Sequence, residues 1–230
     1  MGCAPEDRCD CLKGSGEVIS EVRAIEQFDK LEINNTFIVN IIQDSLPGIV
    51  VAAGENLLPE IITRVENGTL IIENKNTCNW VREYRDIYIT LRTTDVREIV
   101  INGESKLYSS DTLFLNKLLI NVYADIAVID MAFNLNEIHL NVHAGTGDFT
   151  LKGVTQSGFY YIHGTGYLWA DRLHAKYVDF NHNSTGDFHI NSSKILIARL
   201  HAPGNAYFSG DPDSVYIAEK SSTGLLIKVP

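Results

Sequence analysis

The sequence lacks long apolar runs and long charge runs. No stretch approaches the ~20 apolar residues of a membrane-spanning helix, so we expect no transmembrane helix. The 230 residues carry 29 acids against 19 bases, a formal net charge of −10, and no compact group of Lys and Arg. Because an acidic surface repels phosphate backbones, we expect no nucleic-acid partner.

Helical periodicity and familiar catalytic motifs are also missing. We find no convincing amphipathic helix, and there is no Gly-x-Ser-x-Gly elbow, Walker loop or His-Glu-x-x-His pair. These absences leave no motif for a serine hydrolase, an ATPase or a zinc protease. Hydrophobic residues make up 45% of the chain, which is enough for a sizeable folded core.

Cysteine is scarce and unevenly placed, at Cys3, Cys9, Cys11 and Cys78. We interpret Met1-Gly2 as an addition in front of a mature exported chain, which puts Cys3 where a bacterial lipoprotein is lipidated. In an oxidising compartment one disulfide can join the N-terminal arm to the loop at Cys78, through Cys9 or Cys11. The alternative is free thiols, and the spacing is unlike that of a zinc site.

What the sequence does contain is alternation of apolar and polar residues, which predicts strands. In the first third, residues 30–43 form a strand, residues 44–48 a turn and residues 49–53 the return strand. Asn67-Gly68 lies between two apolar runs and predicts a tight type I′ hairpin. We therefore predict a meander of hairpins for this region.

From about Val96 the chain repeats every 19 or 20 residues. Each repeat has a strand, a small-residue corner such as residues 144–148, a second strand and a polar corner. The repeats start at Leu118, Glu137, Ser157, Lys176, Ile195 and Ser214. Two positions after the corner glycines lie Phe149, Leu168, Phe188 and Leu226, with Tyr207 in the matching place of the fourth repeat.

Strands without helices at this period predict an all-β, right-handed parallel β-solenoid, in which each turn buries its apolar face against neighbours ~4.8 Å away. We expect the corner glycines to adopt a positive φ. The inward parity is ambiguous, because apolar residues occupy even positions in the Glu137 and Ile195 repeats and odd positions in the Lys176 repeat. The predicted regions are a tether (1–16), β-hairpins (17–95) and the solenoid (96–230).

Several segments carry a family resemblance: "CDCLKGSGEVISEVRAIEQFDKLEI", "AAGENLLPEIITRVENGTLII", "NTCNWVREY" and the "GTGD" and "STGD" corners. From Cys9 onward the chain resembles the putative auto-transporter adhesin, head GIN domain family of Bacteroidetes surface and periplasmic lipoproteins. The resemblance implies an exported, β-solenoid-like protein, often anchored by a lipidated cysteine, with no catalytic motif. It also implies Cys11 and Cys78 as the disulfide pair. The histidine content departs from the family pattern.

All seven histidines lie between His139 and His201. Four of them, His143, His163, His182 and His201, occupy position seven of consecutive repeats, which predicts one column of rings. Such a column can be a stack of corner residues, a metal-ligand set, or an element that responds to acid near the ordinary histidine pKa of ~6.5. Stacking is the simplest of the three.

Exposed aromatic residues offer a different site. Tyr161, Tyr167, Trp169, Tyr177 and Tyr207 are candidates for stacking on sugar rings, and the alternative is that they line half-buried strand faces. Asp148 and Asp187 follow corner glycines, but a 19-residue period lacks the nine-residue calcium repeat. We therefore expect these aspartates to hydrogen-bond within their own turns.

We predict a non-catalytic cell-envelope protein, an adhesin or surface binding module without a cofactor, located as an outer-membrane lipoprotein or in the periplasm. The expected partner is a surface glycan or protein, with membrane contact only through a lipid anchor and self-association through the open end of the solenoid. The alternative is a polysaccharide-degrading β-solenoid enzyme. Its candidate residues, Asp171, Arg172, His174 and Asp179, show no convergent spacing.

Overall fold

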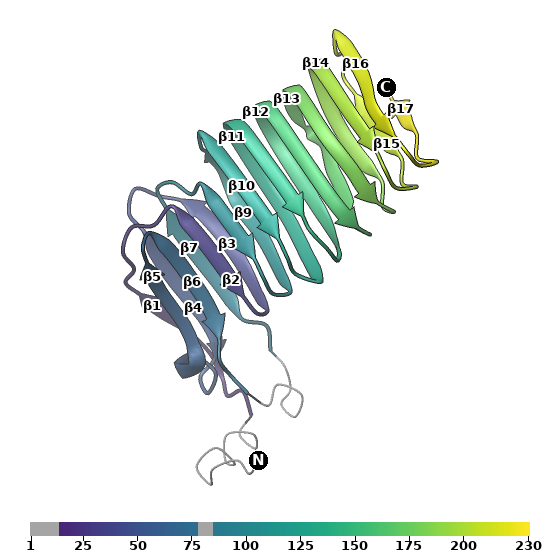
Figure 1. Ribbon diagram of the computed structural model, residues 1–230. Coiled ribbons are helices and arrows are strands. Elements are labelled where there is room, and N and C mark those ends of the chain that lie inside the picture. Colours follow the sequence, from purple (N-terminus) through teal and green to yellow (C-terminus); the bar gives the residue numbers. More distant parts are fainter. Residues whose placement is uncertain (1–13, 78–84) are drawn as a thin grey trace.

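The structure is a computed structural model that describes residues 14–77 and 85–230. It confirms the predicted fold class, because the strands stack as a parallel β-solenoid with antiparallel strands at the N-terminal end. Figure 1 shows an elongated stack with β1 and β5 at one end and β16 and β17 at the other. In the described part of the chain, no helix is long and apolar enough to span a membrane.

The elements follow one another along the chain with short connections. They are β1 (Val18–Arg23), β2 (Lys30–Asn34), β3 (Phe37–Gln43), β4 (Gly48–Gly54), the 3-10 turn η2 (Leu58–Glu60), β5 (Ile61–Glu66), β6 (Thr69–Asn74), β7 (Tyr88–Thr93), β8 (Glu98–Ile101), β9 (Ser105–Phe114), β10 (Lys117–Val122), β11 (Ile126–Val142), β12 (Thr146–Gly164), β13 (Tyr167–Ser184), β14 (Phe188–Leu200), β15 (Ala206–Ser209), β16 (Ser214–Lys220) and β17 (Leu226–Lys228).

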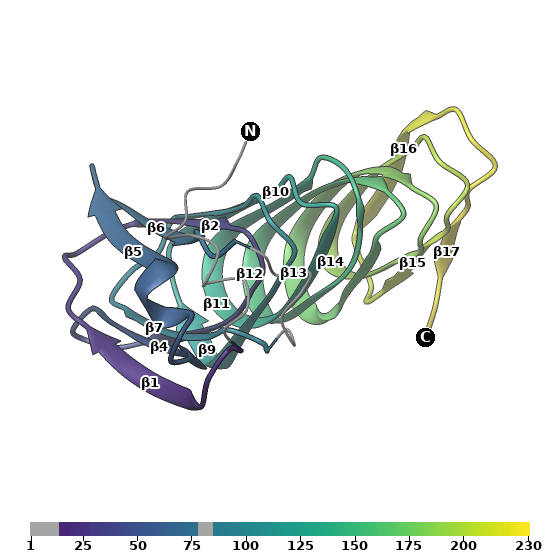
Figure 2. The same ribbon diagram turned by 90° about the horizontal axis from the view of Figure 1, so that it is seen from below.

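From β10 onward the turns stack in chain order. β10 pairs in parallel with β11, and each strand from β11 to β13 pairs in parallel with the next long strand. The long strands bend, so the first part of each completes one turn and the last part begins the next. Figure 2 shows these turns as successive loops around a common interior.

Alternating side chains fill that interior. Phe149, Leu168 and Phe188 pair in register across β12, β13 and β14 and are fully buried. The column continues through Ala206, which pairs with Phe188 and Leu226. The prediction that Tyr207 occupies this place is wrong by one residue, because Tyr207 pairs with His189 on the outward side.

The repeat boundaries also shift by one residue at two places. The residues that stack are Lys117, Glu137, Ser157, Tyr177, Ile195 and Ser214. Their intervals are 20, 20, 20, 18 and 19 residues, so Lys117 replaces the predicted Leu118 and Tyr177 replaces Lys176. With Tyr177 as the start, even-numbered positions face inward in this repeat too, as Val178 and Phe180 do, which removes the ambiguity in parity.

The corner glycines are of two kinds. Gly145 and Gly164 have a positive φ, 89° and 121°, as predicted. None of Gly147, Gly166, Gly186, Gly204 and Gly224 has a positive φ. A Cβ on Gly186 would lie 2.4 Å from the carbonyl oxygen of Gly166, and one on Gly204 would lie 2.3 Å from that of Gly186. At these five positions the close approach of successive turns, and not a positive φ, therefore excludes a side chain.

The N-terminal strands are not stacked in chain order. β2 pairs in parallel with β6 and β8, and β3 pairs in parallel with β7 and β9. The turn built by residues 30–43 therefore lies between two turns that come later in the sequence. The predicted hairpin between residues 30–43 and 49–53 is wrong, because β7 lies between β3 and β4.

Antiparallel strands close this end of the stack. β4 pairs with β1 and β7, and β5 pairs with β6 through the hairpin predicted at Asn67-Gly68. Both turn residues have positive φ, 50° and 77°, as a type I′ turn requires, so this prediction is confirmed. The Arg23 guanidinium donates to the Leu58 carbonyl at 3.0 Å and links β1 to η2.

Strand pairing is continuous across the predicted boundary at residues 95 and 96. β8 pairs in parallel with β2 on one side and with β10 on the other. Buried residues of both regions form one hydrophobic core, from Phe28 to Phe208. Parallel stacking thus begins at Lys30, and the division into regions stays a prediction.

Candidate functional site

The four histidines predicted to share one column do not all face the same way. Strand pairing sets His163 beside Asn183, whereas His182 pairs with Leu200. His143 and His163 are exposed, but His182 is fully buried. The expected column is therefore wrong at His182, and Asn183 takes the outward position.

The outward histidines contact different kinds of neighbour. The ring of His143 stacks on Tyr123 with centroids 4.4 Å apart. His201 Nδ1 lies 2.9 Å from Ser221 Oγ, and His201 Nε2 lies 3.4 Å from the Glu219 carboxylate. Among residues 14–77 and 85–230, no three His, Cys, Asp or Glu side chains are grouped as a metal ion would require.

His182 lies in the core against an aromatic ring. Its ring centroid is 3.9 Å from that of Phe188, and the Ser184 N–H donates to its Nδ1 at 3.4 Å. Nε2 has no hydrogen-bond partner in the part of the chain that the structure describes. Burial lowers the pKa of His182, because a charged ring would lose its hydration.

A histidine that the sequence analysis did not single out joins an aromatic ladder. His189 lies between Trp169 and Tyr207, with centroid distances of 4.4 Å and 4.9 Å and planes within 15° of parallel. Tyr167 lies beside Trp169 at 6.3 Å. Alternation with the buried Phe188 was the signal that His189 faces outward.

This ladder leaves little ring face for a sugar. Both faces of His189 are covered by its neighbours, so the middle of the ladder offers only ring edges to solvent. Each such ring pair adds about 0.5–1.5 kcal/mol beyond burial, which stabilises the stacked turns. The ladder is better suited to holding turns together than to sugar stacking.

The two remaining predicted aromatic residues, Tyr161 and Tyr177, lie in the last parts of β12 and β13, after the bend. Tyr161 tilts against His143 at 6.0 Å. Tyr177 is 46% exposed, pairs with Ser157 and Ile195, and has no ring contact among the described residues. Of the five predicted aromatics, Tyr177 therefore keeps the most accessible ring face.

Asp148 and Asp187, the two aspartates that follow corner glycines, form hydrogen bonds with the following turn. Asp187 Oδ1 accepts the Asn205 N–H at 2.7 Å, and Asp148 Oδ1 accepts from Trp169 Nε1 at 3.4 Å. Tyr167 separates the two aspartates in the stack. Their role in the structure is to link turns, and the expected bonds within their own turns are replaced by bonds between turns.

The charged residues weighed as enzyme candidates divide between two parts of a turn. Arg172 and His174 are exposed beside Asp171, in the corner of β13 where the register shifts. Asp179 lies on the next run and forms an ion pair with Arg199. Among the described residues, the structure thus brings basic groups together at this corner, and it places no pair of free carboxylates beside them.

One acid has a clearly perturbed pKa on the same run. Glu137 accepts a hydrogen bond from Lys117 at 2.5 Å, and His139 Nε2 lies 2.6 Å from the same oxygen. These contacts lower the pKa of Glu137, with Lys117 the larger cause. Because His139 also stacks on Phe159 at 4.6 Å, the cluster is held in place by neighbours on both sides.

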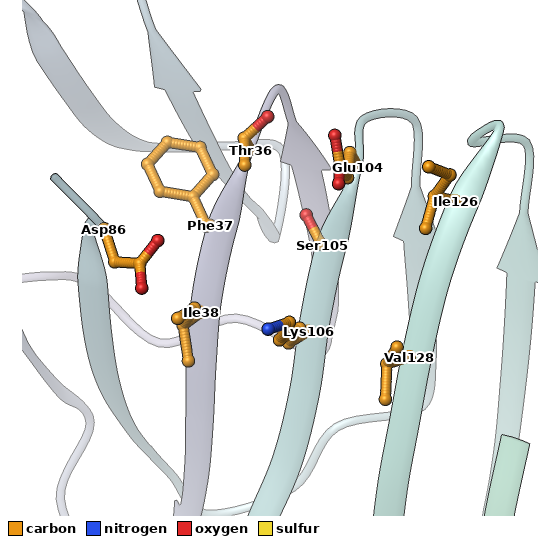
Figure 3. Close-up of a pocket in the computed structure, with 9 residues that line it drawn as sticks. All are labelled: Thr36, Phe37, Ile38, Asp86, Glu104, Ser105, Lys106, Ile126 and Val128. Carbon is orange, nitrogen blue, oxygen red and sulfur yellow. The ribbon is translucent and has the colours of Figure 1, made fainter. Parts of the chain in front are cut away.

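A groove crosses the strands near the N-terminal end, as Figure 3 shows. Its volume is about 490 Å³, within the range of about 300–1,000 Å³ for small-molecule sites. Ile38, Ile126 and Val128 provide apolar walls, and the Lys106 ammonium points across them. Carboxylates also border the groove, from Asp86 and Glu104.

The predicted covalent sites lie outside the described residues. These are the lipidation of Cys3 and the disulfide between Cys78 and Cys9 or Cys11. The tether predicted for residues 1–16 is described only from Gly14. All three stay predictions.

Comparison with known proteins finds a family and several similar folds. A family model described as "Putative auto-transporter adhesin, head GIN domain" matches residues 27–212. No curated protein matches the chain.

Three solved structures share the fold at low sequence identity. A putative adhesin from Bacteroides fragilis has a TM-score of 0.85 and 17% identity, covering 93% of this chain and 97% of its own. A putative lipid binding protein from Parabacteroides distasonis has a TM-score of 0.72 and 19% identity, covering 94% and 98%. A putative adhesin from Parabacteroides merdae has a TM-score of 0.67 and 16% identity, also covering 94% and 98%.

Proposed function

Because the chain belongs to the putative auto-transporter adhesin, head GIN domain family, we propose that it is a non-catalytic binding module displayed at the cell envelope. Its ligand is a surface glycan or protein. The chain is exported and is held at the outer membrane or in the periplasm, with Cys3 as the lipid attachment point. The family resemblance supports this location.

The observation that carries the proposal is the register of exposed side chains along a rigid stack. Outward residues of successive turns are aligned by parallel pairing, as in the column of Ser157, Tyr177 and Ile195. The next residues along these strands, Val178 and Leu196, are buried in the core. Such a surface presents many side chains at fixed spacing, which suits an extended ligand that is bound but not converted.

The enzyme alternative has less support. General acid–base chemistry needs groups that converge on one substrate atom. Asp179 is neutralised by Arg199 and lies on a different run from Arg172 and His174. A glycosidase-like pair of carboxylates facing one groove has no support from this arrangement.

A lipid is a second candidate ligand, favoured by the groove in Figure 3. Its apolar walls can accept an acyl chain, and Lys106 has no ion-pair partner among the described residues. One similar structure is described as a putative lipid binding protein. The carboxylates of Asp86 and Glu104 on the same groove disfavour an anionic head group, so this candidate ranks second.

The test is a binding survey with the intact chain. Purified protein is applied to arrays of bacterial and host glycans, to immobilised surface proteins and to phosphatidylcholine vesicles. We expect saturable binding to a glycan or a protein, and no shortening of the bound glycan on chromatography. Cleaved products would contradict the non-catalytic role. Binding to vesicles alone, lost in Lys106→Gln, would replace the first candidate with the lipid, and no binding anywhere would overturn the proposal.

A further inference from the structure

The corner of one turn, within β13, contains extra residues compared with its neighbours. From Trp169 to Leu173 β13 takes four steps where β12 takes three, from Thr150 to Gly153. From Ala170 to Ala175 β13 takes five steps where β14 takes two, from Ile190 to Ser192. Bulges of this kind bend a strand and redirect its side chains, and they are common next to functional sites.

This longer corner presents three basic side chains on one side. Arg172, His174 and Lys176 alternate with the buried Leu173 and Ala175, and all three are exposed. We call these three residues the basic corner. Across residues 14–77 and 85–230 none of them has an ion-pair or side-chain hydrogen-bond partner. Asp171 is the one acid in residues 170–176, so Arg172 and Lys176 leave an excess of positive charge.

The corners on either side are neutralised. Lys152, in the preceding turn, forms an ion pair with Asp130 at 2.6 Å. Lys194, in the following turn, forms one with Asp213 at 3.0 Å. The whole chain has a net charge of −10. Of these three stacked corners, only that of β13 has basic side chains without an ion-pair partner among the described residues.

A small hollow lies beside the basic corner. It has a volume of about 260 Å³ and is bordered by His174 and Lys176, together with Gln156 from β12 and Asn191 from β14. Val154, 48% exposed, gives it an apolar wall. The size is just below that of drug-sized sites and fits a single ring with its substituents.

An aromatic ring follows the basic corner at once. Tyr177 is the next residue after Lys176, and both are exposed because the strand bends there. Its small neighbour in the preceding turn, Ser157, leaves room against one ring face. Cations, amides and an open aromatic ring are what a charged sugar needs: ionic bonds for its acid group, donors and acceptors for its hydroxyls, and a surface for its ring.

We propose that the hollow at the basic corner binds an acidic sugar unit of a polysaccharide. Its carboxylate or sulfate lies on Lys176, which borders the hollow, and Arg172, exposed on the same corner outside the hollow, adds a second positive charge. Gln156 and Asn191 bond its hydroxyls, and the neighbouring sugar packs on Tyr177. A long polyphosphate fits less well, because it has no hydroxyls for Gln156 and Asn191 and no sugar ring to pack on Tyr177. This assignment rests on the proposed binding role and gives it a ligand class.

The test uses the intact chain and three oligosaccharides of equal length. Calorimetry measures binding of oligogalacturonate, which carries carboxylates, of a heparin fragment, which carries sulfates, and of neutral maltooligosaccharide. We expect one or both acidic ligands to bind and the neutral one not to bind. The double variant Arg172→Gln/Lys176→Gln should lose about tenfold or more of that affinity, as loss of charge-assisted bonds predicts. Tyr177→Ser should weaken binding several-fold, about as loss of a stacked ring does.

Lys194→Gln is the matched control, since it removes a positive charge from the same edge but one that is already paired with Asp213. We expect it to change affinity less than about threefold, as surface ion pairs contribute little. Equal losses in Lys194→Gln and in the double variant would show general charge attraction and overturn the site. Failure of every acidic ligand to bind would also overturn it. If a ligand from the wider survey binds the wild type and the double variant equally well, the adhesive role is supported but this site is not where that ligand binds.

Discussion

At the scale of single residues, the direction of one side chain decides what a histidine can do. His143 and His163 face solvent, whereas His182, at nearly the same place in its repeat, is buried against Phe188. A buried neutral ring with an unpartnered Nε2 contributes packing, not ligation. The consequence is a dependence of stability on pH.

We expect acid to destabilise the fold through His182. Its pKa in the folded state is lowered by burial from the ordinary value of 6.5, so the unfolded chain binds more protons below that pH. The stability given by neutral His182 is therefore present above the unfolded pKa and is lost as the pH falls toward the folded one. The slope is at most about 1.4 kcal/mol per pH unit.

Urea denaturation at pH 7.5 and pH 5.5 measures this effect. The free energy of unfolding should fall less between the two pH values in His182→Leu than in the wild type. His163→Leu, which replaces an exposed histidine, is the matched control. An identical fall in His182→Leu and the wild type would place the acid sensitivity elsewhere.

At the scale of elements, the last turn of the solenoid has a sheet edge that is unpaired in the described part of the chain and carries both exposed apolar residues and lysines. β16 leaves Val215 41% and Ile217 52% exposed, because no turn packs on them in this structure. The same strand ends with Lys220, which pairs with the buried Leu200, and β17 places Lys228 against Phe208. Lysine at the end of a core column disfavours the packing of a further apolar turn.

We therefore expect these lysines to limit end-to-end association of the 230-residue chain. Replacing both with apolar residues, as Lys220→Val/Lys228→Val, extends the exposed core columns without changing the buried ones. The variant should show a larger mass than the wild type at equal concentration by light scattering after gel filtration. Lys117→Val, on an inner turn, should not. Equal masses for all three proteins would show that the two lysines do not protect the edge.

At the scale of the whole molecule, the order of stacking couples the N-terminal third to the repeats. The turn made by β2 and β3 lies between the β6–β7 and β8–β9 turns, so both of these turns pack on it. In a stack where each turn contacts only its neighbours, the effect of a core defect should fade with distance.

Hydrogen exchange can follow that decay. Ile33→Ala removes a fully buried side chain from β2 and should cost about 2–5 kcal/mol. We expect faster exchange in the neighbouring β6 and β8, and little change in β14. Leu196→Ala, in β14, is the mirror-image control and should loosen β13 and β16 instead. A uniform increase along the whole chain would mean that the stack unfolds as a single unit.

The features of the fold that the sequence predicted are those that depend on residues close together in the chain. The fold class, a repeat of about 20 residues and the Asn67-Gly68 hairpin all depend on alternation, spacing and turn chemistry between near neighbours. The structure confirms the fold class and the hairpin, and it confirms the predicted interval of 19 or 20 residues except between Tyr177 and Ile195, where the interval is 18. The inward direction of His182 was also within reach, because Val178 and Phe180 alternate with it. The candidate site was visible only as separate charges and rings.

The rest was decided by tertiary structure. The register at Tyr177 depends on extra residues in one corner, which sequence spacing alone cannot distinguish from a longer strand. The place of residues 30–43 between later turns depends on pairing over long separations. That His174 and Lys176 share a hollow with side chains from two other strands depends on both. Alternation and period come from neighbours in the chain, so the sequence determined the architecture, whereas strand pairing brings distant residues together, so only the stacked turns determined the site.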